Sequence, residues 1–155
     1  MSESFDFVAM DIPPDADLNV VLVECQPGEN NAWRVPAYLF RLQTDSGQYI
    51  GRIRLRVGWN EDIIKYAGHV GYAVEPEFRG RRYAERACRL ILPLARRHGL
   101  EHVWITCQPE NFASRRTLER LGAECVGIVD VPVEYPLEAG VERKKMCFRL
   151  STLPL

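Results

Sequence analysis

The stretch GYAVEPEFRGRRYA, residues 71–84, runs from an apolar strand through a tight basic turn into the start of a helix. Residues 68–74 are mostly apolar and predict the strand, which Pro76 ends because proline cannot donate to a sheet ladder. The unpaired N–H groups of the helix start and the helix dipole favour an anion such as phosphate, and Gly80 lets the backbone approach it closely. An arginine-rich helix start is also often only a solvated face, so on geometry alone both interpretations stay open.

The elements on either side of this stretch predict a mixed α/β domain. Apolar residues recur every three or four positions over residues 82–98, which predicts a helix ending at Gly99. A shorter helix is predicted over residues 113–121. Apolar or alternating segments predict the remaining strands, at residues 20–23, 37–43, 52–57, 102–107, 125–131 and 145–150. Because a helix connects strand 68–74 to strand 102–107, these two strands are expected to form a central parallel pair.

Length, charge and cysteine content narrow the classes of function. With 155 residues, the chain is expected to form one domain, residues 18–155, preceded by a loose N-terminal leader, residues 1–17. With a net charge of −1, the chain lacks the broad positive potential that nonspecific nucleic-acid binding needs, so no nucleic-acid partner is expected. The five cysteines lack the spacing of a metal site, which predicts no metal and a reducing, cytoplasmic setting. We expect no secretory signal and no membrane partner, since no apolar run approaches the roughly 20 residues of a membrane span.

Two motifs in this sequence resemble those of the GCN5-related N-acetyltransferase (GNAT) family. Residues 74–84, VEPEFRGRRYA, are similar to the family's acetyl-CoA motif, in which an R/Q-x-x-G-x-G/A turn follows a strand of this type. Residues 111–122 are similar to the family's N-x-x-A/S-x-x-x-Y-x-x-x-G segment, through Asn111, Ser114 and Gly122. The resemblance runs from residue 35 to residue 150. It implies a GNAT-like α/β (α+β) fold, with a mixed, mostly antiparallel sheet whose central parallel strand pair is flanked by helices.

The resemblance also implies an activity and a donor, acetyl-CoA. The protein would be an N-acetyltransferase in which a primary amine attacks the thioester directly in a ternary complex, helped by a backbone N–H of strand 68–74. The backbone of Tyr72, Ala73 and Val74 would pair with the pantetheine arm, which would insert where strands 68–74 and 102–107 splay apart. Asn111 would hydrogen-bond the arm, and Ser114 would face the same cleft. The residues implied to bind the pyrophosphate are Arg79, Gly80, Arg81, Arg82, Tyr83, Ala84 and Glu85.

Three positions depart from the family pattern. Arg82 stands where glycine is usual, which costs backbone freedom but adds a guanidinium that can bind phosphate. Leu118 stands where the family has the tyrosine commonly proposed to protonate the departing thiolate. A thiol with a pKa of about 8.5 can leave without much help, so turnover does not require that tyrosine. Thr106 stands where some relatives carry a glutamate base.

The candidate general bases are His69 and Glu75. His69 is the titratable side chain in the window where other relatives place a base, but a core or hydrogen-bonded histidine is the alternative. Glu75 lies at the end of its strand and can equally be a solvated carboxylate. Cys107 can in principle accept an acyl group, although a buried structural thiol is the simpler interpretation because no histidine partner is identifiable.

The acceptor site is expected to be open on one side. Residues 26–36 form a Pro, Gly and Asn loop where relatives usually carry a pair of helices, so the N-terminal helices of the fold are reduced. Arg52, Arg54 and Arg56 share one side of an alternating strand. They predict either a solvated edge or an open groove for a large or acidic acceptor, such as a polypeptide terminus. Acceptor selection is expected in loops 26–36 and 132–142, with Glu134 and Tyr135 as positional candidates.

Two other functions and the assembly stay open. A noncatalytic acyl-CoA-binding or sensing domain would explain Leu118, Arg82 and the lack of a firm base, and amine-dependent thioester cleavage would exclude it. A nucleotide-phosphate binder could use the same turn, and competition by ADP as strong as by acetyl-CoA would favour it. Residues 146–150 carry alternating apolar side chains that can pair across a homodimer as easily as complete a monomer core. The family resemblance favours the homodimer.

Overall fold

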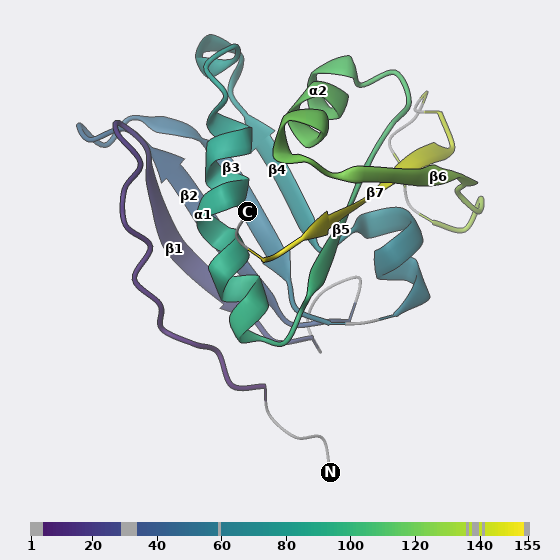
Figure 1. Cartoon of the computed structure of the whole chain (residues 1–155), viewed down its shortest axis with the longest axis horizontal. Coiled ribbons are helices and arrows are strands. Elements are labelled where there is room, and N and C mark those ends of the chain that lie inside the picture. The colour runs from purple at the N-terminus through teal and green to yellow at the C-terminus, as the bar shows by residue number, and fades with distance from the viewer. Residues whose placement is uncertain are drawn as a thin grey trace.

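The computed structural model describes residues 5–28, 34–58, 60–135, 137, 140 and 142–153. Its strands form two antiparallel sheets, with strand orders β1-β2-β3-β4 and β5-β7-β6 (Figure 1). The strands are β1 (Asn19–Gln26), β2 (Ala37–Gln43), β3 (Tyr49–Arg56), β4 (Val70–Val74), β5 (His102–Cys107), β6 (Glu124–Asp130) and β7 (Lys144–Ser151). The helices are α1 (Tyr83–Arg97) and α2 (Phe112–Leu121), with a π-helical turn at Ile63–Ala67 and a 3₁₀ turn at Pro76–Phe78. No helix in these described ranges has the length and apolar character of a membrane span.

The predicted helices and strands are confirmed, with ends that differ by a few residues. Strands 37–43 and 102–107 have the predicted bounds, and the long helix begins one residue later than expected. The π-helical turn stands where the sequence predicted only a polar connection. Its buried Ile63 explains the difference, because one apolar anchor in a polar segment gives no period to detect.

Alternation in β3 separates the core of the first sheet from its outer face. Ile53 and Leu55 are buried and face the helix side, where α1 lies across the sheet (Figure 1). The buried face of α1 has the three- and four-residue spacing of an amphipathic helix and consists of Tyr83, Ala87, Cys88, Ile91, Leu94 and Ala95. The arginines at positions 52, 54 and 56 point the other way, as strand geometry requires.

The expected parallel pairing of strands 68–74 and 102–107 is not found. β4 and β5 are edge strands of separate antiparallel sheets. Just before β4, the N–H of His69 donates to the carbonyl of Trp104 at 2.6 Å. Within the described residues no backbone hydrogen bond joins β4 to β5 beyond that point. The two strands therefore touch at one end and separate along their length.

Gly68 and His69 hold the two segments together at one end and stop the ladder there. Gly68 has φ +74°, and a β-carbon there would lie 2.8 Å from the carbonyl oxygen of Trp104, so the close approach requires glycine. The Nδ1 atom of His69 accepts the backbone N–H of Trp104 at 2.9 Å. A side chain therefore takes the hydrogen bond that a neighbouring strand would otherwise receive, and the ladder stops.

The N-terminal segment differs from the loose leader that the sequence predicted. Its residues 5–12 place aromatic and aliphatic side chains against the core, and the N–H of Val8 donates to the hydroxyl of Tyr38 at 2.7 Å. Arg86 of α1 binds the carboxylates of Asp15 and Asp17 at 2.6 and 2.8 Å. These contacts attach the segment to the start of α1. In the loop predicted over residues 26–36, residues 29–33 lie outside the described part of the chain.

Candidate active site between the separated strands

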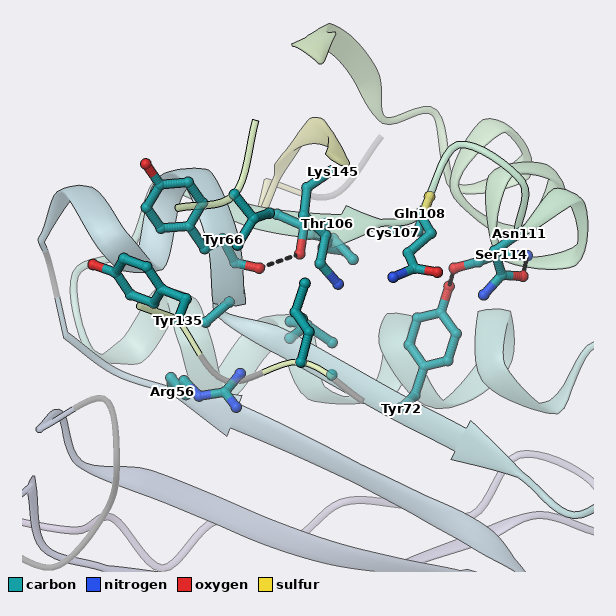
Figure 2. Close-up of a pocket in the computed structure, with 16 residues that line it drawn as sticks. Arg56, Tyr66, Tyr72, Thr106, Cys107, Gln108, Asn111, Ser114, Tyr135 and Lys145 are labelled. Atoms are coloured by element: carbon teal, nitrogen blue, oxygen red, sulfur yellow. Dashed lines mark hydrogen bonds between the residues drawn. The ribbon is translucent and has the colours of Figure 1, made fainter. Parts of the chain in front are cut away.

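A cleft of about 390 Å³ lies where β4 and β5 diverge. Its walls come from β4, β5, the start of α2 and the segment that follows β6 (Figure 2). The described residues that line it include two cationic side chains, Arg56 and Lys145, and no carboxylate. The cleft therefore suits a ligand that is neutral or negatively charged near its walls.

One end of the cleft carries a bridge between two hydroxyl groups. The Tyr72 hydroxyl from β4 lies 2.6 Å from the Ser114 hydroxyl of α2 (Figure 2). Burial raises the pKa of Tyr72 above its ordinary value, so its phenol stays protonated at neutral pH. The Oδ1 atom of Asn111 caps α2 by accepting the N–H of Ser114 at 3.1 Å. Its amide nitrogen has no hydrogen-bond partner among the described residues, which leaves two donors beside the cleft.

The basic turn directly before α1 contains two residues with positive φ. Gly80 has φ +85°, and Arg82, directly before α1, has φ +60° in the left-handed region. A residue with a β-carbon costs about 1–2 kcal/mol more than glycine in that conformation, which explains why glycine is usual at this position in the family motif. Arg79, Gly80, Arg81 and Arg82 are all exposed. Arg79 donates its Nε to the carbonyl of Val74 at 3.1 Å, and Arg81 lies over the ring of Phe78. The three exposed arginines and the first N–H groups of α1 form a positively charged surface.

Two of the residues predicted to bind pyrophosphate have side chains that are used elsewhere. The buried Tyr83 donates its hydroxyl to the carboxylate of Asp17 in the N-terminal segment. Glu85 is buried beside Arg89, and its Oε1 atom has no hydrogen-bond partner in the described part of the chain. Tyr83 and Glu85 can therefore offer an anion only their backbone N–H groups. The side chain of Ala84 has no polar atom, so the same holds for it.

His69 holds the backbone beside the cleft instead of lining it. Its side chain is fully buried, its Nδ1 accepts from Trp104, and its Nε2 lies 2.9 Å from the carbonyl oxygen of Gly58. A neutral ring that donates from Nε2 satisfies both contacts. Burial lowers the pKa of His69 to about 4, so the ring is neutral at physiological pH.

The other side chains considered for catalysis are poorly placed or poorly suited to react in the cleft. Glu75 is exposed beyond the end of β4, next to Tyr49, and does not line the cleft. Leu118 is completely buried in the core. Cys107 lines the cleft, but burial raises the pKa of its thiol, which disfavours the nucleophilic thiolate. The Thr106 hydroxyl donates to the carbonyl of Tyr66 at 2.9 Å, so it positions the π-helical turn.

The opposite end of the cleft contains residues that sequence reasoning did not assign to it. Burial lowers the pKa of Arg56 to about 10, and its guanidinium donates to the carbonyl of Gly68 at 3.1 Å. Lys145 of β7 is half-buried, and burial lowers its pKa as well. The rings of Tyr66 and Tyr135 meet with centroids 4.7 Å apart (Figure 2). Tyr135 had a sequence signal in its place in loop 132–142, and Arg56 had one as the last of three alternating arginines. Tyr66 and Lys145 had none, because neither the π-helical turn nor the pairing of β7 gives a local pattern.

Comparison with known proteins identifies what this architecture is similar to. The family model described as "Acetyltransferase (GNAT) domain" matches residues 14–124. RimJ of Mycobacterium smegmatis, solved in complex with CoA-disulfide, superposes with a TM-score of 0.60 at 20% identity, over 74% of this chain and 53% of that one. The ribosomal-protein-S5-alanine acetyltransferase of Vibrio fischeri gives 0.60 at 19%, over 75% and 62%. The microcin C7 self-immunity acetyltransferase MccE, in complex with acetyl-CoA and AMP, gives 0.57 at 18%, over 74% and 61%.

These likenesses establish the fold, and the chain spans between about half and two thirds of the length of these three solved chains. A search of curated proteins gave no match.

Proposed function

This chain belongs to the acetyltransferase (GNAT) domain family, and we propose on that premise that it is an acetyl-CoA-dependent N-acetyltransferase that acts on a primary amine. The observation that carries the proposal is the separation of β4 and β5 beyond the His69 to Trp104 hydrogen bond, which opens the cleft. If β4 and β5 were hydrogen-bonded along their whole length, no space would remain between them for a thioester and an amine to react.

The residues around the cleft fit a pantetheine arm and a diphosphate. Among the described residues, β4 forms a ladder with β3 alone and β5 with β7 alone. Beyond the contact between His69 and Trp104, each strand therefore presents an unpaired edge of N–H and C=O groups to the gap. Tyr72, Ala73 and Val74 on one edge and the Asn111 amide opposite would hold the amides of the arm. The basic turn, with Arg79, Arg81 and Arg82 exposed, would hold the diphosphate.

Bound acetyl-CoA would supply an activated acetyl group, whose transfer to the amine forms a C–N bond, breaks the C–S bond and releases the CoA thiol. The chain's own contribution begins with a β4 backbone N–H, which would donate to the carbonyl oxygen as negative charge develops on it. The paired hydroxyls of Tyr72 and Ser114 would provide the proton that the leaving thiolate takes up, in place of the absent tyrosine at Leu118.

The acceptor ammonium would release one proton to solvent before attack, favoured by charge instead of by a conventional base. The proton that leaves the nitrogen as the amide forms would replace the one that the hydroxyl pair gives to the thiolate. His69 already uses Nδ1 to accept from Trp104 and has a pKa of about 4, so it is a poor proton acceptor at the cleft. Arg56 and Lys145 both line the cleft, and a positive environment lowers the pKa of a bound ammonium. The two cations would therefore favour the neutral, nucleophilic amine.

Calorimetric titration of the purified protein with acetyl-CoA and with ADP tests the donor site. The same titrations are repeated with the variant Asn111→Ala. Binding that weakens in the variant and that ADP does not match supports the proposal, and absence of binding overturns it. Release of CoA thiol, followed with and without a panel of amines, then tests turnover. Binding without any amine-dependent thiol release would instead identify a noncatalytic acyl-CoA sensor.

A further inference from the structure

The outer face of the first sheet carries a groove of about 520 Å³ that is lined by four arginines. They are Arg41 of β2 and Arg52, Arg54 and Arg56 of β3. No Asp or Glu is among the described residues that line the groove. Arg56 and the β4 residues Gly71 and Tyr72 line both this groove and the cleft, so the two are continuous.

The positive charges in this groove are not balanced within the described chain. Arg41 lies directly opposite Arg52 in the β2–β3 ladder, an arrangement that is destabilising for like charges. The charge of Arg54 disfavours the protonated form of Arg56. Neither Arg52 nor Arg54 has a hydrogen bond or an ion pair in the described part of the structure. An anion bound here would relieve repulsion that the fold otherwise retains.

An open path leads from these arginines to the place of reaction. Gly71 and Ala73 of β4 lie opposite Arg54 and Arg52 in the ladder, where larger side chains would close the groove. A β-carbon added at Gly71 would meet nothing closer than the Arg56 guanidinium, 3.9 Å away. A chain lying over β3 could therefore extend a side-chain or terminal amine past Gly71 toward Tyr72.

We propose that this face binds an acidic polypeptide, which makes acidic polypeptides the acceptor class of the proposed acetyltransferase. Alternate residues of an extended peptide repeat every ~6.6–6.8 Å, which is also the spacing of Arg52, Arg54 and Arg56 along β3. Val23 and Leu39 provide apolar contacts at the side of the groove, as a peptide requires. Nucleic acid is the less favoured polyanion because the chain as a whole carries a net charge of −1. The proposal rests on the acetyltransferase function for its acceptor role, but the binding itself does not require catalysis.

Fluorescence anisotropy with labelled lysine-containing peptides tests the binding directly. The three probes are an acidic peptide with carboxylates at alternate positions, its Asn/Gln counterpart and its Lys/Arg counterpart. We expect the acidic peptide to bind most tightly, with an affinity that falls as salt is raised. Arg54→Glu should weaken it by about tenfold or more and reduce the preference over the basic peptide without reversing it, because three arginines remain in the groove. Arg96→Glu, an exposed arginine on α1 across the sheet, is the matched control and should leave binding unchanged.

The outcomes separate this inference from the proposed function. Equal binding of the three peptides, or indifference to Arg54→Glu, overturns the inference even if acetyl-CoA is bound and turned over. Absence of acetyl-CoA binding overturns the acetyltransferase role even if the acidic peptide binds. Tighter binding of single-stranded DNA than of the acidic peptide, or a dimer that Arg54→Glu dissociates, would assign the face to nucleic acid or to a second copy of the chain. With an active enzyme, Arg54→Glu should raise KM for the acidic acceptor and leave KM for acetyl-CoA unchanged.

Discussion

The hydroxyl of Tyr72 lies 2.6 Å from the hydroxyl of Ser114, which joins β4 to α2 across the mouth of the cleft. The two residues come from different elements on either side of the gap between the sheets, so this side-chain contact spans a place where no backbone ladder does. Ser114 is buried and Tyr72 partly buried, so the pair lies inside the cleft instead of on the open surface.

Tyr72→Phe should lower kcat, because it removes one hydroxyl of the proton-donating pair while keeping the ring. General acid groups contribute about 10²-fold or more, but a thiol leaves readily, so we expect a loss nearer to about tenfold. KM for acetyl-CoA should change little. Steady-state kinetics with thiol detection measures both values. Leu118→Phe, a core substitution that adds no hydroxyl, serves as a comparison for general disturbance of the cleft, and an unchanged kcat in Tyr72→Phe would exclude the pair as donor.

Replacement of Asn111 separates its capping role from its ligand role. Asn111→Ala removes the acceptor for the Ser114 N–H, so it should cost about 1 kcal/mol of unfolding free energy and also weaken acetyl-CoA binding. Asn111→Asp keeps a capping oxygen but loses the two amide donors, so it should weaken binding with little loss of stability. Urea denaturation and calorimetric titration report the two effects. Equal loss of stability in both variants would contradict this division.

Arg82→Gly should make the fold more stable but weaken the binding of acetyl-CoA. Arg82→Gly relieves a left-handed residue at φ +60° and should raise the unfolding free energy by up to about 1 kcal/mol. The same change removes a cation from the basic turn, so the affinity for acetyl-CoA should fall by a few-fold and depend less on salt. Arg82→Ala is the matched control, since it removes the charge but keeps the β-carbon and thus the strain. If both variants bind acetyl-CoA as the parent does, Arg82 does not contact the diphosphate.

His69 should make the fold sensitive to acid. Its pKa is about 4 in the folded chain and 6.5 for an unperturbed histidine, so the unfolded state takes up the proton first as the pH falls. Stability from the neutral ring is complete above pH 6.5 and is lost between pH 6.5 and about 4. The loss amounts to roughly 3 kcal/mol. Urea denaturation across that range measures it.

His69→Gln should be less stable at neutral pH and should have a shallower pH dependence than the parent over the same range. His102→Gln, at an exposed position at the start of β5, should keep the slope of the parent. If the unfolding free energy of His69→Gln falls with pH as steeply as that of the parent, then carboxylates or other histidines control acid unfolding.

The sequence pattern predicted the elements well, whereas the separation of the two central strands was implied only by the family resemblance. Periodicity located α1 and α2 and all of the strands, because helical and strand patterns are local. The break between β4 and β5 depends on one imidazole that occupies the N–H of Trp104, a contact between residues far apart in the chain. No local pattern carries such information, so the crossover predicted only a parallel pair, and the place where the two strands separate came from the family resemblance alone.

Sequence analysis predicted the site residues that belong to a contiguous motif, but it did not place those that reach the cleft from other elements. Tyr72, Asn111 and Ser114 belong to motifs, and the structure brings all three to one end of the cleft. Lys145 enters from β7 only because that strand pairs beside β5, so no spacing could have indicated it. Arg56 was recognisable as the last of three alternating arginines, but its place at the junction of groove and cleft required the ladder register.

The pleat of β3 has an evolutionary consequence. Positions 53 and 55 maintain the core, whereas positions 52, 54 and 56 face outward along the groove. Substitutions at the outward positions change surface charge without creating a buried cavity, so they escape the stability threshold that purges most core changes. Descendants of this chain can therefore change the charge of this face through a few codons on a single strand, while the scaffold around it stays constant.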